Sequence, residues 1–202
     1  MNRLVLYPAL LPPIAYMAWV AHEGAVWNTM APFDKRSWRN RYRIYGPHGP
    51  QDLSAPIVKE SLGGPLRDVR LEQRGNWAEK EWRAIESSYR KASFFEAIAD
   101  ELHQIISVEH EFLIDRIETS MNWVCSSLRM EMIEDVSERT WNLKPIKPSA
   151  EVPGVEYRQV FSHVGGFKSH LSILDLLMNE GPLSYDILKD QSLLFPPSRI
   201  QP

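Results

Sequence analysis

The stretch RLVLYPALLPPIAYMAWVAHEGAVWNTM, residues 3–30, decides the fold of this chain. Residues 3–7 are mostly branched or aromatic, which predicts a short strand. Pro13 suits the first turn of a helix, and Gly24 is typical of the position where a helix ends. Residues 25–30 then predict a second strand. A strand, a helix and a strand in this order predict a βαβ unit with parallel strands and a right-handed crossover.

The same stretch also has the apolar run of a secretory signal or a membrane anchor, because no charged side chain occurs between Leu4 and Ala21. Pro8, Pro12 and Pro13 interrupt that run. Each proline removes a backbone donor that a helix in lipid would use. We therefore expect a cytoplasmic protein without a membrane span.

The composition indicates a soluble globular chain of one domain, or of one domain with an appendage. The 202 residues carry a formal net charge of −3, and 44% of them are apolar. The single cysteine, Cys125, excludes an internal disulfide and a zinc site built on several thiolates. The mild acidity argues against a nucleic-acid partner. No glycine-rich phosphate loop or helical metal motif is present, so the sequence identifies no cofactor and predicts no metal site.

Alternating residues predict a β-hairpin after the βαβ unit. Tyr42 and Ile44 fall on one side of an extended segment, and residues 53–57 alternate again after the turn-forming residues 46–50. The hairpin loop is therefore expected to have five residues or more. A further strand is expected over residues 68–72. Amphipathic helices are expected in three later stretches: 76–89, 93–105 and 113–128.

These elements predict an α/β fold, in which the hairpin joins the parallel strands in one mixed sheet flanked by amphipathic helices. A mostly helical body with a small separate sheet is the alternative. The expected parts are an α/β core over residues 1–140, a proline-rich linker or loop over 141–154, a strand–helix segment over 155–190 that packs on the core, and a tail over 191–202. Within the third part we expect a strand over residues 157–161 and a helix over 172–179 that ends at Gly181.

Five cationic side chains lie within residues 35–43 of a chain that is net acidic. Arg39, Asn40 and Arg41 offer N–H donors of the kind that bind carboxylate or phosphate groups. Trp38 offers a flat surface beside them. This basic segment is therefore a candidate site for an anionic small molecule. The alternative is a solvated edge strand whose charges prevent aggregation.

Tryptophans and carboxylates give weaker candidates. The seven tryptophans, Trp77 among them, would suit a surface on which sugars or bases stack, although packing in the core is their commoner use. Asp175 lies on an expected helix and is a candidate general base, although a capping or solvent-facing role is commoner for such a carboxylate.

An ordered set of short segments resembles the WbqC-like family of bacterial proteins. The segments are LPPIAY (11–16), RNR (39–41), LSAP (53–56), NW (76–77), IESSY (85–89), FFE (94–96), YRQVF (157–161), GF (166–167) and LSILDLLMNEGP (171–182). They cover nearly the whole chain. The chain departs from the family's pattern at Glu81, where a histidine is expected before Trp82. A base role would therefore pass to Glu81, or the activity would be altered.

The resemblance implies a role in O-antigen or other surface-polysaccharide biosynthesis, with transfer of an aminoacyl group such as glycine to a sugar as the suggested reaction. The first hypothesis is thus a cytoplasmic group transferase acting on a nucleotide-linked or lipid-linked sugar. Arg39, Asn40 and Arg41 would stabilise negative charge, and Glu81 or Asp175 would be the base. Tyr16 and Trp77 would contact the substrate. We expect the loop before Tyr16 and the basic segment to converge in a cleft at the carboxyl ends of the parallel strands.

The second hypothesis is a non-catalytic binding or scaffold protein of a glycan-assembly pathway. It predicts that the basic segment spreads over a flat face, beside an apolar patch of exposed tryptophans.

Overall fold

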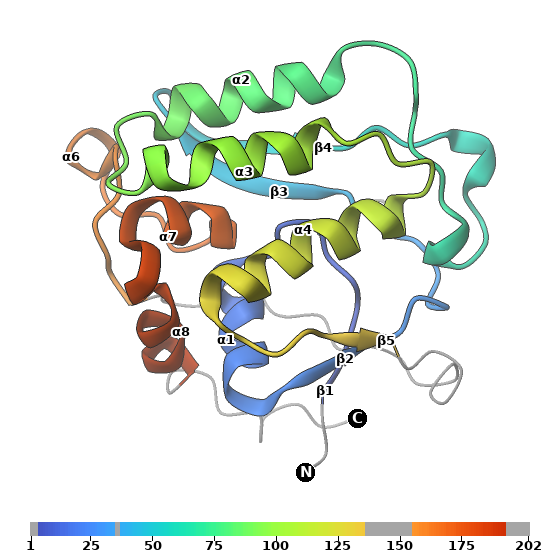
Figure 1. Ribbon diagram of the computed structural model, residues 1–202, viewed down its shortest axis with the longest axis horizontal. Helices are drawn as coiled ribbons and strands as arrows, with labels where there is room; N and C mark the ends of the chain where they lie inside the picture. The colour runs from blue at the N-terminus through green and yellow to red at the C-terminus, as the bar shows by residue number, and fades with distance from the viewer. Residues whose placement is uncertain (1–3, 35–36, 136–154, 193–202) are drawn as a thin grey trace.

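The computed structural model describes residues 4–34, 37–135 and 155–192 (Figure 1). The expected linker over 141–154 and most of the expected tail over 191–202 lie outside these residues. The helices are α1 (Ile14–Glu23), α2 (Trp77–Tyr89), α3 (Phe95–Ser107), α4 (Leu113–Leu128), α6 (Ser162–Gly165), α7 (Ile173–Glu180) and α8 (Ser184–Ser192), with the 3-10 helices η1 (Lys59–Ser61), η2 (Leu66–Asp68) and η3 (Gly181–Leu183). No helix within these described ranges is long and apolar enough to cross a membrane.

Strands β1 (Leu4–Leu6) and β2 (Ala25–Trp27) are joined by α1 and pair in parallel, as the opening stretch predicts. A third strand, β5 (Glu134–Asp135), pairs in parallel with the other side of β2, so the strand order is β1-β2-β5. The sequence does not indicate β5, because two acidic residues have neither the alternation nor the composition of a strand.

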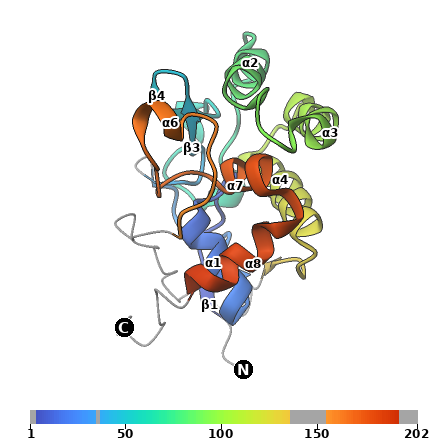
Figure 2. The ribbon, with the colours of Figure 1, turned by 90° about the vertical axis from the view of Figure 1, so that its left-hand side faces the viewer.

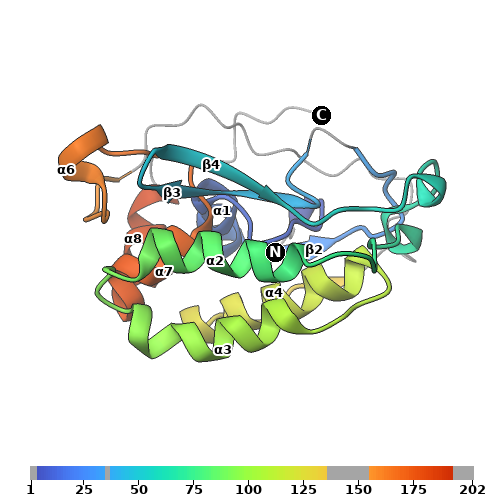
Figure 3. The same cartoon turned by 90° about the horizontal axis from the view of Figure 1, so that it is seen from above.

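The hairpin of β3 (Arg41–Gly46) and β4 (Gly49–Ser54) forms a sheet of its own in the described part of the chain. The α/β class is confirmed, but the expectation of one continuous sheet is wrong. Tyr42 and Ile44, on the inward side of β3, are fully buried against α2, while the free edge of β3 is met by the start of α7, where the Ser172 N–H donates to the Arg43 carbonyl. Figure 3 shows α2 between the hairpin and α3. The loop is also shorter than expected, because Gly46 pairs with Gly49.

Two further expected strands are not formed. In the stretch 68–72, Val69 and Leu71 are buried as expected, but the backbone pairs only through isolated bridges to two different segments. No ladder can therefore continue. In the stretch 157–161 the backbone is irregular and pairs with no strand of the described residues; the Gln159 side chain bonds the N–H and the carbonyl of Lys168.

The expected amphipathic helices are present as α2, α3 and α4, and α7 follows them near the C-terminus. The Asn76 side chain forms no capping hydrogen bond at the start of α2, whereas Ser172 accepts one from the backbone N–H of Leu174 at the start of α7. Helix α7 is almost wholly buried, and α8 packs against α1 (Figure 2). The core therefore extends from the parallel strands to the C-terminal helices.

Candidate functional site

The parallel strands β1, β2 and β5 run in one direction, so their carboxyl ends meet at one edge of the sheet, which we call the carboxyl edge. In open α/β sheets this edge is the usual place of ligand binding. The chain leaves β1 at Tyr7, leaves β2 at Asn28 and ends β5 at Asp135. Neighbouring strands lie about 4.8 Å apart, so the outer two exits are separated by on the order of 10 Å.

Arg39 from the basic segment lies at the first of these exits. Its guanidinium carbon lies 3.9 Å from the centroid of the Tyr7 ring, and one of its terminal nitrogens donates to the Ser37 hydroxyl at 2.8 Å. The side chain is only 2% exposed, and its Nε has no hydrogen-bond partner. Burial lowers the pKa of the guanidinium, an effect that Tyr7 and Asp34 partly oppose. No carboxylate in the described residues forms an ion pair with it.

The loop before α1 reaches the same place. The Leu10 N–H donates to the Trp38 carbonyl at 3.0 Å, and the Tyr16 hydroxyl donates to the Tyr7 carbonyl at 2.8 Å. Tyr16 also accepts from the indole N–H of Trp27, and its burial raises its pKa. The structure therefore brings this loop and the basic segment together at the carboxyl end of β1. Tyr16 is buried, and it supports the loop through its hydrogen bond to the Tyr7 carbonyl.

The rest of the basic segment leads from this point into β3. The Asn40 amide nitrogen donates to the Ala55 carbonyl at 3.0 Å, while its Oδ1 is buried without a hydrogen-bond partner. Arg41 and Trp38 are half-buried. Arg43 forms an exposed ion pair with Asp52, and its guanidinium lies 5.7 Å from the Trp38 ring centroid. Lys35 and Arg36 lie outside the described residues.

The exits of β2 and β5 are polar and acidic. The Thr29 hydroxyl donates to the Asp135 carboxylate at 2.7 Å. The two residues border a shallow hollow of about 260 Å³, whose other polar lining residues are Arg67, Asp115 and Glu118. Partial burial, and then the neighbouring charges of Asp115 and Asp135, raise the pKa of Glu118. No motif in the sequence marks Glu118 or Asp135 as a site residue, and Thr29 was not among the expected site residues. Only the position of Thr29, near the end of the strand expected over residues 25–30, could have indicated it.

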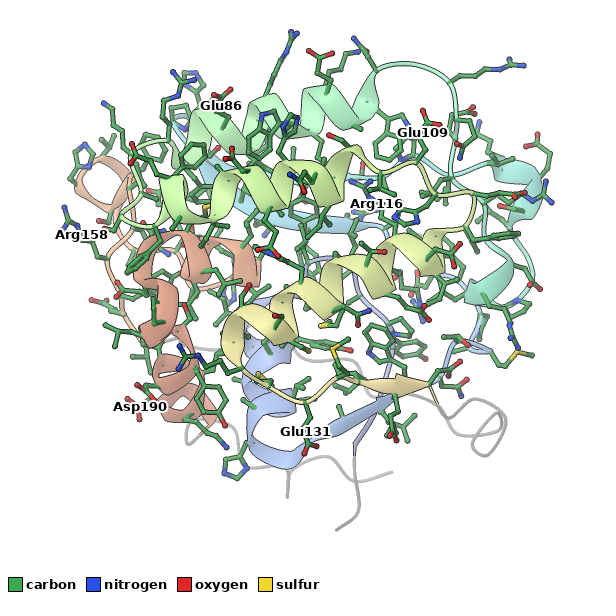
Figure 4. All side chains as sticks on the ribbon, viewed as in Figure 1. Glu86, Glu109, Arg116, Glu131, Arg158 and Asp190 are labelled. Carbon is green, nitrogen blue, oxygen red and sulfur yellow. The ribbon has the colours of Figure 1, made fainter. Side chains whose placement is uncertain are left out.

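Glu81 is a buried structural partner in this fold. Its carboxylate accepts from Arg116 at 2.6 Å and from the Tyr42 hydroxyl at 2.7 Å, so both oxygens are engaged. Arg116 also donates to the Ile106 carbonyl and lies in the interior, between α3 and α4 (Figure 4). The trio ties α2, α4 and β3 together. Neither oxygen of the buried carboxylate faces a hollow where it could act as a base on a substrate. The catalytic role of Glu81 therefore stays a prediction.

Asp175 lies in a second buried cluster, in the first turn of α7. Its Oδ2 accepts from the Tyr157 hydroxyl at 2.5 Å and from the Gln159 amide at 3.2 Å, while its Oδ1 has no partner. Burial raises its pKa from 3.8 to about 6, although hydrogen bonds from Tyr157, Tyr89 and Gln159 act in the opposite direction. A carboxylate with this pKa can exchange a proton near neutral pH. Its catalytic role also stays a prediction.

The tryptophans in the described residues do not form an exposed patch. Of the six that the structure describes, Trp27 and Trp123 are buried and the other four are half-buried. Trp77 donates to the Glu72 carbonyl at 2.8 Å, and the Arg116 guanidinium lies 4.8 Å from its ring centroid. Trp77 therefore packs beside the Glu81 cluster and not at the carboxyl edge.

The described residues contain no group of three or more His, Cys, Asp or Glu side chains arranged to hold a metal ion. Cys125 is buried in α4, and burial raises its pKa to about 11, so its thiol stays protonated near neutral pH. That Arg39, Asn40 and Arg41 hold an anionic ligand stays a prediction.

Fold and site together define an α/β protein with a basic segment at the carboxyl edge of a short parallel sheet. A family model, described as the WbqC-like protein family, matches residues 7–147. The chain belongs to this family, as its ordered segments indicate. It is also 30% identical over 194 residues to the uncharacterized protein Rv1507c of Mycobacterium tuberculosis, across 78% of this chain and 84% of that protein. No solved structure matches the chain.

Proposed function

We propose that this protein is a group transferase for a small anionic substrate, which it binds at the carboxyl edge of the parallel sheet. Arg39, Asn40 and Arg41 hold the anionic group, over the ring of Tyr7. The sugar acceptor, the aminoacyl group such as glycine and the surface-polysaccharide pathway rest on the family resemblance. No contact in the structure is used to support these three parts of the proposal.

The observation that carries the proposal is the buried charge of Arg39, which forms no ion pair with a carboxylate of the described residues, although Asp34 acts on it from a longer distance. A buried ion without a partner costs several kcal/mol of folding free energy, so proteins rarely keep one for stability alone. Arg39 has a ring and a hydroxyl as partners, and its Nε has none. A carboxylate or phosphate brought by a substrate would supply the missing negative charge and acceptor atoms.

A transferase also uses a base for the acceptor, and the acidic hollow at the exits of β2 and β5 offers accessible carboxylates. Glu118 and Asp135 are exposed there. The pKa of Glu118 is raised, which places it closer to neutral pH than the pKa of an ordinary glutamate. We therefore place Glu118 ahead of the buried Glu81 and Asp175 as the proposed base. The scaffold hypothesis loses one of its two expectations, because the exposed tryptophan patch is absent from the described residues.

The test combines binding with stability for Arg39→Met, with Arg70→Met as the matched control. Arg70 is an exposed arginine that pairs with Glu111 at 3.4 Å, far along the chain from the basic segment. Calorimetry with UDP-, GDP- and dTDP-linked sugars and with free amino acids should find a ligand for the native chain and for Arg70→Met. Arg39→Met should weaken binding at least tenfold, since a charge-assisted bond to the anion is worth about 1.5–3 kcal/mol.

The stability readout separates a binding role from a structural one. Because methionine removes a buried unpaired charge and keeps most of the side-chain volume, Arg39→Met should leave the free energy of unfolding unchanged or raise it by about 1 kcal/mol. Unchanged affinity in Arg39→Met, or no ligand among the probes, would count against the proposal. A loss of several kcal/mol of stability would assign Arg39 a structural role.

A further inference from the structure

The last two turns of α2 border a pocket of about 470 Å³, which we call the α2 pocket. The turn of the hairpin contributes Pro47 to its lining, and the segment 155–170 contributes Val160 and Phe161. In Figure 1 the C-terminal end of α2 lies close to α6 of this segment, and Glu86 marks that end of the helix in Figure 4. The volume lies within the range of pockets that hold small molecules, about 300–1,000 Å³.

Hydrogen bonds hold the segment 155–170 in place as a wall of the pocket. The Tyr45 hydroxyl, at the end of β3, donates to the Phe161 carbonyl at 3.1 Å, and the centroids of the two rings lie 5.8 Å apart. The Gln159 amide donates to the Asp175 carboxylate of α7 at 3.2 Å. The pocket is therefore formed before a ligand arrives, which lowers the entropic cost of binding.

Cationic side chains outnumber carboxylates on the α2 side of the pocket. Arg83, Arg90 and Lys91 line it together with one carboxylate, that of Glu86. Arg83, Ser87 and Arg90 follow each other at spacings of four and three residues, so they share one face of the helix. The C-terminal end of a helix adds a partial charge of about −0.5, which does not cancel the excess of cations. The lining is therefore positive, in a chain whose formal net charge is −3.

The ion pairs that these cations form are weak enough for a ligand to replace. Arg83 pairs with Glu79 and Arg90 pairs with Glu86, in each case one turn away on the outer surface of α2. Exposed pairs of this kind contribute little to stability. Lys91 is exposed and forms no ion pair with any described residue. An anionic ligand can therefore recruit all three cations without breaking a buried contact.

The other sides of the pocket are apolar or weakly polar. Pro47, Val160 and Phe161 offer carbon atoms against which a flat or hydrocarbon group would pack. The hydroxyls of Ser87 and Ser88 each donate to a carbonyl of their own helix, at 3.0 and 2.7 Å, so their lone pairs remain to accept a hydrogen bond. The lining thus suits a molecule with a negative charge at one end and an apolar group at the other.

We infer that the α2 pocket binds a small organic anion, with its phosphate or carboxylate group on Arg83 and Lys91 and its apolar part against Phe161. The inference is independent of the transferase proposal, because the two sites lie at opposite ends of β3. Arg41 begins this strand, and Gly46 ends it beside the hairpin turn. At a rise of about 3.3 Å per residue, these ends are separated by roughly 16 Å. The α2 pocket is therefore a second site, apart from the carboxyl edge.

Chemical-shift mapping by NMR on the full, isotope-labelled chain tests the inference with phenyl phosphate, inorganic phosphate and phenol as probes. Phenyl phosphate should shift the amide signals of Ser87, Lys91 and Phe161 saturably, with a Kd of about 1–10 mM, which is ordinary for a ligand of this size. Inorganic phosphate and phenol each carry only one part of the recognised chemistry, so each should bind about tenfold more weakly or less. Phenol that binds as well as phenyl phosphate would overturn the inference, as would phenyl phosphate without a saturable shift.

Variants separate the pocket from unspecific attraction of anions. Arg83→Met combined with Lys91→Met should weaken the binding of phenyl phosphate about tenfold, because both charge-assisted contacts are lost. Arg74→Met is the matched control and should leave the affinity unchanged, since Arg74 is exposed and precedes the first turn of α2, at the far end of the helix. Ser87→Trp should fill the pocket and abolish binding with no change in charge, and it also serves if the double variant fails to fold.

Arg39→Met, which alters the carboxyl edge, should leave the binding of phenyl phosphate in the α2 pocket unchanged. Loss of the shifts at Ser87 and Lys91 in Arg39→Met would show that the probe reports the carboxyl edge, and this would overturn the inference. Equal affinity in the double variant and in Arg74→Met would do the same, as would binding that persists in Ser87→Trp.

Discussion

Buried charges distinguish this chain at the scale of single residues. Arg39, Glu81, Arg116 and Asp175 are all less than a tenth exposed, yet only Glu81 and Arg116 neutralise each other. A buried ion pair contributes little net stability, but the loss of one partner leaves an uncompensated charge. The two kinds of buried charge therefore predict opposite responses to substitution.

The Glu81–Arg116 pair gives the sharper case. Glu81→Ala or Arg116→Ala should each lower the free energy of unfolding by about 3–5 kcal/mol, because the remaining charge is stranded in the core. The double variant Glu81→Leu with Arg116→Met should lie within about 1–2 kcal/mol of the native chain. Urea denaturation measures all three. The control is Arg43→Ala, which breaks the exposed pair with Asp52 and should change the free energy of unfolding by less than about 1 kcal/mol. A loss of unfolding free energy in the double variant as large as the sum of the two single losses would contradict this account.

Single residues of the site were predictable where the signal is local. The density of cations in residues 35–43 needs no partner to be noticed, and the unusual Glu81 is visible as a departure from the family's pattern. Their partners are remote in sequence, however. Tyr7 lies 32 positions from Arg39 and Arg116 lies 35 positions from Glu81, so only the fold assigns them.

At the scale of elements, local signals predicted where helices end better than which strands pair. Gly24 and Gly181 follow α1 and α7 as expected. The expected strand over 157–161 is not formed, because its backbone has no partner strand in the described residues. A strand forms only where a second strand pairs with it, and the local sequence pattern does not identify that partner.

Gly181, which follows α7 and begins η3, provides the test at the scale of elements. Its φ of +50° is paired with a ψ of −120°, and a Cβ atom would lie 2.4 Å from the Phe94 ring. Gly181→Ala should therefore destabilise the fold by about 2–4 kcal/mol, from backbone strain and the clash together. In a Phe94→Leu background the same substitution should cost less, because only the strain remains. Thermal denaturation of the four chains closes the cycle; an equal cost in both backgrounds would assign the whole effect to the backbone.

On the scale of the whole molecule, the two small sheets are joined through the start of α7. The Ser172 hydroxyl donates to the Leu11 carbonyl at 2.7 Å, and its N–H donates to the Arg43 carbonyl at 2.8 Å. The backbone N–H of Ile173 also donates to the Pro12 carbonyl. Sequence patterns predicted each of these elements, but they could not predict that a C-terminal helix, in place of a shared ladder, would connect the βαβ unit to the hairpin.

This arrangement predicts that the part of the chain matched by the family model cannot stand alone. A chain ending at residue 154 lacks the apolar side chains of α7, at most 1% exposed: Ile173, Leu174, Leu176, Leu177 and Met178. Their burial contributes on the order of 10 kcal/mol, which is comparable with the whole stability of an ordinary domain. We expect the shortened chain to lack a cooperative thermal transition by circular dichroism, while a chain ending at residue 192 keeps one. A cooperative transition near the native midpoint in the shorter chain would show that α7 is an addition to a self-sufficient core, and that Ser172 is not what holds the two sheets together.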